Sequence, residues 1–208
     1  TYPPRYYQRI AINRTLDAIA RGQDRLLLVM ATGTGKTYAS AFGVRDALKP
    51  SGKVLFIVHR KTILRQALES YRRVFGSEKK MALLTGEDQD YKAIEQADFV
   101  FAMITMISRN DVLNRFHPHD YQIAVLDEVH HAAAVSYQKV MNYFKPVFWL
   151  GMTASPERMD DFDVFDLFDH NMTDRTGKYI VFCAGLEHMN EMIGKAREWF
   201  SRIDNEPN

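Results

Sequence analysis

The sequence predicts an α/β fold in which helices cover both faces of a parallel sheet. Apolar runs of strand length alternate along the chain with segments of helical periodicity. The apolar runs are continuous rather than alternating, which is typical of strands buried on both faces. With 208 residues, 46% of them hydrophobic, the chain is long enough for one domain with a substantial core. The helical segments then supply the two covering layers.

The predicted elements follow in the order that such a fold requires. Strands are expected at residues 25–30, 53–58, 80–85, 99–104, 122–127, 147–152 and 179–183. Helices are expected at residues 7–20, 36–48, 61–75, 105–115 and 136–144. Ligands of such sheets bind beyond the carboxyl ends of the strands. The candidate site residues are therefore those that follow Met30, Val58, Leu126 and Gly151.

Charge and composition restrict the function classes. The 27 basic and 26 acidic residues nearly cancel, giving a formal net charge of +1. No global positive field is present, so any nucleic-acid surface must be local. No secretory signal and no apolar stretch of membrane-spanning length is found, and Cys183 is the single cysteine. We expect a soluble, cytoplasmic protein without a membrane partner.

A glycine-rich loop follows the first predicted strand and leads into a helix. Its sequence is Ala31-Thr32-Gly33-Thr34-Gly35-Lys36-Thr37. The two glycines let the backbone curl so that successive N–H groups face phosphate oxygens, and the helix N-terminus adds further donors. The Lys36 ammonium can reach the β- and γ-phosphates, and the Thr37 hydroxyl can bind the magnesium ion between them. These residues predict a phosphate-binding loop.

This loop departs from the strict pattern G-x-x-x-x-G-K-[ST] at one position. The pattern requires glycine where the chain has Met30. A glycine-rich loop without function is the alternative interpretation. The strand before the loop and the helix after it favour phosphate binding.

Two carboxylates, Asp127 and Glu128, stand at the end of the apolar run 123–126. Adjacent charges of one sign repel each other, so a cation is expected beside them. Magnesium meets this expectation: Asp127 would hold the ion, and Glu128 would polarise the attacking water as a general base. Taken alone, the pair could instead be an N-cap and a first-turn charge of the next helix. Zinc bound by His130 and His131 is rejected because no third ligand has suitable spacing.

The phosphate loop, the acidic motif and Thr153-Ala154-Ser155 resemble motifs I, II and III of superfamily 2 helicases and translocases. Their order and spacing resemble the DExH group that contains the motor subunits of type I and type III restriction enzymes. The resemblance covers about residues 5–170 and implies the N-terminal RecA-like lobe of a P-loop NTPase that uses ATP and Mg²⁺. It also implies that His130 and the Thr153–Ser155 motif couple the nucleotide site to neighbouring motifs.

Shorter matches imply further contacts. Arg5-Tyr6-Tyr7-Gln8 resembles the Q-type motif, which implies that Gln8 contacts adenine and that Arg5 lies beside the nucleotide. Motifs Ia and Ib match His59-Arg60 and Thr85-Gly86, and a further family threonine matches Thr105. The resemblance implies nucleic-acid contacts for Arg60, Thr85, Gly86 and Thr105. Hydroxyls and one arginine suit phosphate contacts, which position a strand without reading its sequence. Arg60 could equally be a solvated charge at a helix start.

The end of the chain sets the expected domain division. Residues 177–183 and the helical pattern after them resemble motif IV, which opens the second RecA-like lobe. Motifs V and VI have no counterpart in the 208 residues. We therefore expect a first lobe at residues 1–171 and a fragment of a second lobe at 172–208. Truncation, internal shortening and natural loss remain open as explanations.

These observations lead to one functional hypothesis and two alternatives. The chain is expected to be the ATP-binding motor lobe of a DNA helicase or translocase, the motor part of a restriction-type enzyme, with double-stranded DNA as partner. A nuclease or specificity function would need another domain or subunit. The first alternative is a nucleotide-dependent nucleic-acid-binding module without turnover in this isolated chain. The second, a P-loop kinase for a small molecule, leaves Thr153–Ser155 unexplained.

Overall fold

The computed structural model describes residues 3–129, 135–154 and 179–182. Their strands form one seven-stranded sheet in the order β3-β4-β2-β5-β6-β1-β7, and every neighbouring pair is parallel. The strands are β1 (Arg25–Met30), β2 (Val54–Val58), β3 (Met81–Leu84), β4 (Phe99–Met103), β5 (Ile123–Asp127), β6 (Phe148–Thr153) and β7 (Tyr179–Phe182). The predicted parallel sheet is confirmed, and each strand begins and ends within about one residue of its expected position.

The helices are α1 (Tyr6–Ala20), α2 (Lys36–Ala47), α3 (Lys61–Phe75), α4 (Tyr91–Gln96), α5 (Ile104–Ile107), α6 (Asn110–Leu113) and α7 (Val135–Tyr143). Helix α4 was not predicted, because it is too short for a periodic pattern. Its one sequence signal is Asp90, whose carboxylate accepts hydrogen bonds from the N–H groups of Lys92 and Ala93 at the start of the helix.

The prediction of a single helix at residues 105–115 was wrong. The structure divides this segment into α5 and α6, with extended backbone at Arg109. The carbonyl of Ser108 accepts a hydrogen bond from Lys139 Nζ of α7 at 2.5 Å. Ile107 and Val112 are both buried although they lie five positions apart, a spacing that does not fit one face of a continuous helix. The break lets both side chains reach the core.

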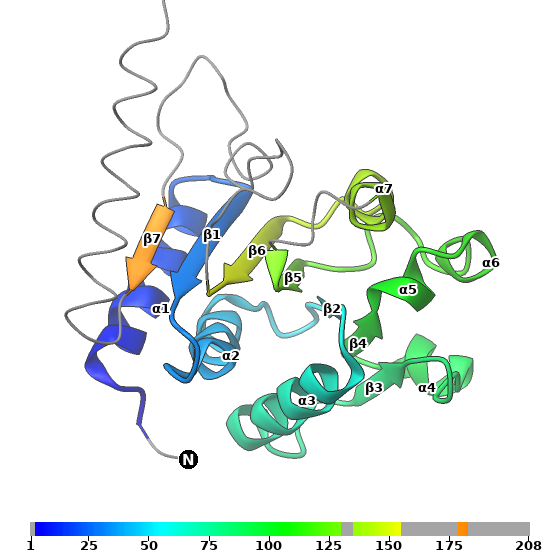
Figure 1. Cartoon of the computed structure of the whole chain (residues 1–208), viewed down its shortest axis with the longest axis horizontal. Coiled ribbons are helices and arrows are strands. Elements are labelled where there is room, and N and C mark those ends of the chain that lie inside the picture. Colours follow the sequence, from blue (N-terminus) through cyan, green and yellow to red (C-terminus); the bar gives the residue numbers. More distant parts are fainter. Residues whose placement is uncertain (1–2, 130–134, 155–178, 183–208) are drawn as a thin grey trace, which may run out of the picture.

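Two helical layers enclose the sheet (Figure 1). Side chains of α1, α2 and α3 pack with one set of buried strand residues, and those of α4 to α7 pack with the other set. Phe56 and Tyr71 lie in the first core with rings 5.5 Å apart, and Tyr137 and Trp149 lie in the second. In the part of the chain that the structure describes, no helix is both long and apolar enough to cross a membrane.

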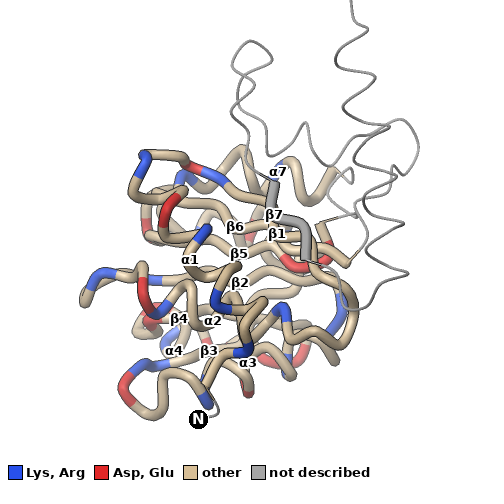
Figure 2. Tube along the Cα trace, turned by 90° about the vertical axis from the view of Figure 1, so that its left-hand side faces the viewer, with Lys and Arg blue, Asp and Glu red and all other residues tan. Residues whose placement is uncertain are grey.

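The topology gathers the motif residues at one edge of the sheet. Because all the strands are parallel, the residues that follow them lie at the same end. The motif I, II and III strands are neighbours there, since β6 lies between β5 and β1. The strands that precede the candidate nucleic-acid contacts, β3, β4 and β2, form the other half of the sheet. Basic and acidic residues are interspersed along the trace instead of separating into two faces (Figure 2).

Candidate nucleotide-binding site

The phosphate loop connects the buried end of β1 to the start of α2. Gly33 and Gly35 have φ angles of 80° and 81°, in the left-handed region that glycine adopts without strain. Gly35 is the N-cap residue of α2, so Lys36 and Thr37 begin the helix. Thr34 is buried, and its hydroxyl donates to the carbonyl of Ala31 at 2.6 Å. This hydrogen bond within the loop stabilises its curled conformation.

Gln8 of α1 forms hydrogen bonds to the backbone of this loop. Its Nε2 donates to the carbonyls of Thr34 at 3.0 Å and Gly35 at 3.4 Å. Its Oε1 accepts a hydrogen bond from the backbone N–H of Arg5 at 2.9 Å. A Cβ atom at Gly35 would lie 2.6 Å from Gln8 Nε2, so a side chain there would displace the Gln8 amide. The motif resemblance implies an adenine contact for Gln8 and does not reveal this connection between α1 and the loop.

The charges of the two motif II carboxylates act on the ammonium group of Lys36. Burial lowers the pKa of Lys36, whereas the nearby charges of Asp127 and Glu128 raise it. Burial raises the pKa of Asp127 to about 6, while the N–H of Glu128 and the ammonium of Lys36 act to lower it. Two loops far apart in sequence thus place one cation and two anions together. A further cation would favour the charged form of Asp127.

Glu128 has an unusual backbone conformation for a residue with a side chain. Its φ is 57°, and among the described residues no other non-glycine residue has a positive φ. Such a conformation costs on the order of 1–3 kcal/mol and is concentrated at functional sites. Its N–H donates to Asp127 Oδ1 at 2.9 Å, which ties the two motif residues together. Its Oε2 is buried without a hydrogen-bond partner among the described residues.

The donor set suits a magnesium ion that is shared with phosphate groups. Within residues 3–129, 135–154 and 179–182, no group of three or more His, Cys, Asp or Glu side chains could hold a metal ion. Magnesium commonly takes one or two protein ligands and completes its shell with water and substrate phosphates. Thr37 at the start of α2 and the buried carboxylate of Asp127 are the hydroxyl and carboxylate that such a site requires.

Thr153 lies between the two motifs on β6. It pairs with Val29 of β1, and its neighbour Met152 pairs with Asp127 of β5. Thr153 is buried and Ala154 is half-buried. A coupling role for these residues stays a prediction. His130 and Ser155, which complete the predicted motifs, lie outside the described residues.

The predicted nucleic-acid contacts lie at the other half of the same edge. Arg60 is exposed at the N-cap of α3, and Thr105 is exposed in α5. Thr85 is fully buried, its hydroxyl donating to the Asp88 carboxylate at 2.9 Å, while Gly86 is exposed. A contact from Thr85 stays a prediction. Its hydroxyl already has a partner, so the exposed backbone of Gly86 offers the simpler contact.

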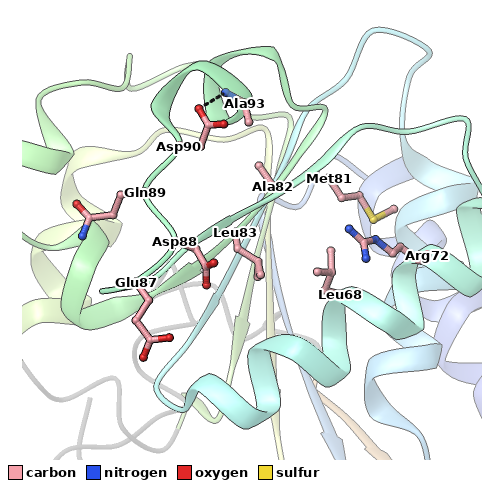
Figure 3. Close-up of a pocket in the computed structure, with 10 residues that line it drawn as sticks. All are labelled: Leu68, Arg72, Met81, Ala82, Leu83, Glu87, Asp88, Gln89, Asp90 and Ala93. Carbon is pink, nitrogen blue, oxygen red and sulfur yellow. Dashed lines mark hydrogen bonds between the residues drawn. The ribbon is translucent and has the colours of Figure 1, made fainter.

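A pocket of about 600 Å³ lies beside the edge strand β3, between α3 and the turn that leads to α4 (Figure 3). Apolar side chains of Leu68, Met81 and Leu83 line it together with Arg72, and Glu87, Asp88 and Asp90 lie on its opposite side. It contains no residue of the phosphate loop or of the acidic motif. Three carboxylates repel phosphate, so we expect nucleic acid to bind at Arg60 and Thr105 rather than here.

A hydrogen-bonded connection joins the nucleotide half to α3. The Ser40 hydroxyl donates to the carbonyl of Thr37 at 2.8 Å and lies 3.1 Å from the Tyr71 hydroxyl. Tyr71 is fully buried in α3 among the rings of Phe56, Phe99 and Phe101. The helix that begins beside Arg60 is therefore joined through Tyr71 and Ser40 to the helix that begins at Lys36. Sequence patterns showed only the apolar face of α3.

A family model described as "Type III restriction enzyme, res subunit" matches residues 1–158. The chain belongs to this family. The type I restriction enzyme EcoAI endonuclease subunit of Escherichia coli is 31% identical over 188 residues, which cover 79% of this chain and 21% of that protein. The putative mitochondrial ATP-dependent helicase irc3 of Schizosaccharomyces pombe is 30% identical over 165 residues, covering 75% of this chain and 26% of that protein.

Solved structures agree with this assignment. The Pyrococcus furiosus Hef helicase domain has a TM-score of 0.70 and 25% identity, with 90% of this chain and 39% of that chain covered. The type ISP restriction-modification enzyme LlaGI has a TM-score of 0.61 and 22% identity, with 94% of this chain and 21% of that chain covered. The predicted RecA-like fold is confirmed. The chain is an N-terminal RecA-like domain related to the res subunits of restriction enzymes and spans about a fifth to a quarter of the two relatives above.

Proposed function

We propose that this chain is the ATP-binding lobe of a motor that couples ATP hydrolysis to movement along double-stranded DNA, as the motor part of a restriction-type enzyme. One observation carries the proposal. Lys36 from the phosphate loop and the Asp127–Glu128 pair lie in one electrostatic environment at the edge of the sheet that also bears the exposed Arg60 and Thr105. A small-molecule kinase would leave the Thr153–Ser155 motif unexplained.

Each residue of the site has a separate task in this proposal. The loop N–H groups and Lys36 bind the phosphates, and the N-terminal end of α2 favours their negative charge. Thr37 and Asp127 would hold Mg²⁺, which neutralises charge on the β- and γ-phosphates when bound. Glu128 accepts the proton of the attacking water. Asp127 would remain charged beside that ion despite its burial.

DNA as the partner is supported by relatives of the same fold. LlaGI was solved with a DNA substrate mimic, and a Sulfolobus solfataricus SWI2/SNF2 ATPase core with a TM-score of 0.59 was solved with double-stranded DNA. We further propose a cytoplasmic protein whose nuclease or specificity function belongs to another domain or subunit. The division into residues 1–171 and 172–208 also stays a proposal. Strand β7 belongs to the second of these segments, although it pairs with β1 in the sheet of the first.

Nucleotide-dependent DNA binding tests this function. Fluorescence anisotropy with labelled double-stranded DNA, single-stranded DNA and RNA should show the tightest binding to duplex DNA, strengthened by Mg²⁺ and a non-hydrolysable ATP analogue. Arg60→Ala should weaken binding about equally for all duplex sequences, because a phosphate contact carries no sequence information. Arg14→Ala, an exposed arginine of α1, is the matched control. Absence of binding at low salt, or binding indifferent to nucleotide, would contradict the proposal.

Gln8→Ala should reduce affinity for ATP and narrow the preference for ATP over GTP. The substitution removes the bonds to Thr34 and Gly35, so the loop becomes less ordered, and it removes the proposed adenine contact. Competition binding with both nucleotides separates the two effects. An equal loss for ATP and GTP would assign Gln8 to the loop alone, and unchanged binding of both would remove it from the site.

A further inference from the structure

Tyr137 is a buried side chain beside the acidic motif to which no role has been given. It lies in the first turn of α7 with only 1% of its surface exposed. Its ring belongs to the same buried cluster as Leu126 and Val129, which flank the Asp127–Glu128 pair. Its hydroxyl has no hydrogen-bond partner among the described residues. An unpaired buried hydroxyl is rare, and a role or an ordered water is expected for it.

A second buried oxygen without a hydrogen-bond partner, in the described part of the chain, belongs to Glu128. This oxygen is the Oε2 atom of the carboxylate. Burial raises the pKa of Tyr137, and the charges of Glu128 and then Asp127 raise it further. A hydroxyl can donate and a carboxylate oxygen can accept, so each group offers what the other lacks. One buried water between them would satisfy both atoms.

The position of Tyr137 determines the side from which its hydroxyl can approach the Glu128 carboxylate. Tyr137 packs on the face of the sheet covered by α4 to α7, whereas α2, which follows the phosphate loop, packs on the opposite face. A bond from Tyr137 therefore reaches Glu128 from the side away from α2. The carboxylate oxygen that is not bound by Tyr137 would then face the nucleotide.

We propose that Tyr137 is a positioning residue for Glu128. Its hydroxyl donates to a buried water, and that water donates to Glu128 Oε2. This contact fixes the carboxylate of a residue whose backbone is already in the left-handed region, and it leaves Oε1 to take the proton of the attacking water. The inference rests on the proposed ATP hydrolysis and adds a residue that sets the geometry of the general base.

The test is Tyr137→Phe, measured in the chain joined to a second RecA-like lobe with DNA present. The ring and its packing are retained and only the hydroxyl is lost. We expect kcat for ATP hydrolysis to fall about tenfold or more, as for other residues that orient a catalytic group. KM for ATP should stay at its wild-type value, because the hydroxyl does not contact the nucleotide. The melting temperature should also stay at its wild-type value, because the ring and its packing are retained.

Tyr143→Phe on the same helix is the matched control. The Tyr143 hydroxyl donates to the carbonyl of Phe116 at 2.6 Å, so its loss should lower the melting temperature and leave kcat unchanged. The two tyrosine variants are thus expected to show opposite patterns. A wild-type kcat in Tyr137→Phe, or a fall in kcat that only accompanies a lower melting temperature, overturns the proposal.

A double variant tests whether Tyr137 acts through Glu128. In the Glu128→Gln background, Tyr137→Phe should not reduce the residual single-turnover rate further, because the base is already absent. A second reduction of the same size as in wild type would show an independent role and overturn the proposal. If the wild-type chain joined to a second RecA-like lobe hydrolyses no more ATP than its Lys36→Ala variant, the proposed function itself fails. Hydrolysis that is normal in Tyr137→Phe overturns only the role of Tyr137.

Discussion

Lys36→Ala abolishes tight binding of magnesium-ATP. Among residues 31–37, Lys36 is the only cationic side chain, and it is the first residue of α2. Its loss would remove a charge-assisted contact to the β- and γ-phosphates and the ammonium group on which the Asp127 and Glu128 charges act. We expect the affinity to fall by about tenfold to hundredfold, the size of a hydrogen bond to a charged group. Calorimetry with Mg²⁺ present measures this.

Lys61→Ala is the matched control for this experiment. Lys61 also begins a helix at the same edge of the sheet, and it forms an ion pair with Glu87 in the nucleic-acid half. Its loss should leave ATP affinity unchanged. Equal affinity in Lys36→Ala and wild type would show that the loop does not bind phosphate.

Glu128→Gln has the opposite pattern: ATP still binds and hydrolysis is lost. Glutamine has nearly the same shape, but it cannot accept the proton of the attacking water. The left-handed backbone at φ 57° is strained for both residues, so the substitution changes the chemistry while keeping the conformation. In the chain joined to a second RecA-like lobe, turnover should fall about 10²- to 10⁴-fold, the usual contribution of a general base.

Hydrolysis and calorimetry on the same preparation separate the possible roles of Glu128. Glu87→Gln, on the exposed turn beyond β3, is the control and should hydrolyse ATP at the wild-type rate. Loss of both binding and turnover in Glu128→Gln would show that Glu128 maintains the structure of the site. Unchanged turnover would remove it as the base.

Much of the fold could be predicted because each buried strand appears in the sequence as a continuous apolar run. Strand β2, for example, is Val-Leu-Phe-Ile-Val and is buried at every position. Parallel strands then bring the loop after β1 and the carboxylates after β5 to one edge, so the two motifs could be combined into one site from the sequence alone. The break between α5 and α6 could not be predicted from the apolar pattern, and the Lys139 side chain that bonds to the carbonyl of Ser108 comes from a distant helix.

The parts of the site that escaped prediction depend on contacts between distant residues. Gln8 was recognised by its motif, but its hydrogen bonds to Thr34 and Gly35 join segments 26 and 27 residues apart. Tyr137 occupies a core position of an amphipathic helix, and nothing in its spacing distinguishes it from Val140. The left-handed backbone of Glu128 has no sequence signal, since glycine or asparagine would be the usual residue there.

In the proposed mechanism, this lobe supplies the phosphate loop and the base, while a second lobe supplies the cation that completes the site. Such a cation stabilises charge on the γ-phosphate and contributes on the order of a thousandfold in rate. The most direct measurement is steady-state ATP hydrolysis, with and without double-stranded DNA, by the 208-residue chain and by the chain joined to a second RecA-like lobe. Lys36→Ala serves as the contaminant control. We predict negligible hydrolysis by the chain alone and DNA-stimulated hydrolysis by the joined protein. Equal rates for the two, above that of Lys36→Ala, would contradict the account.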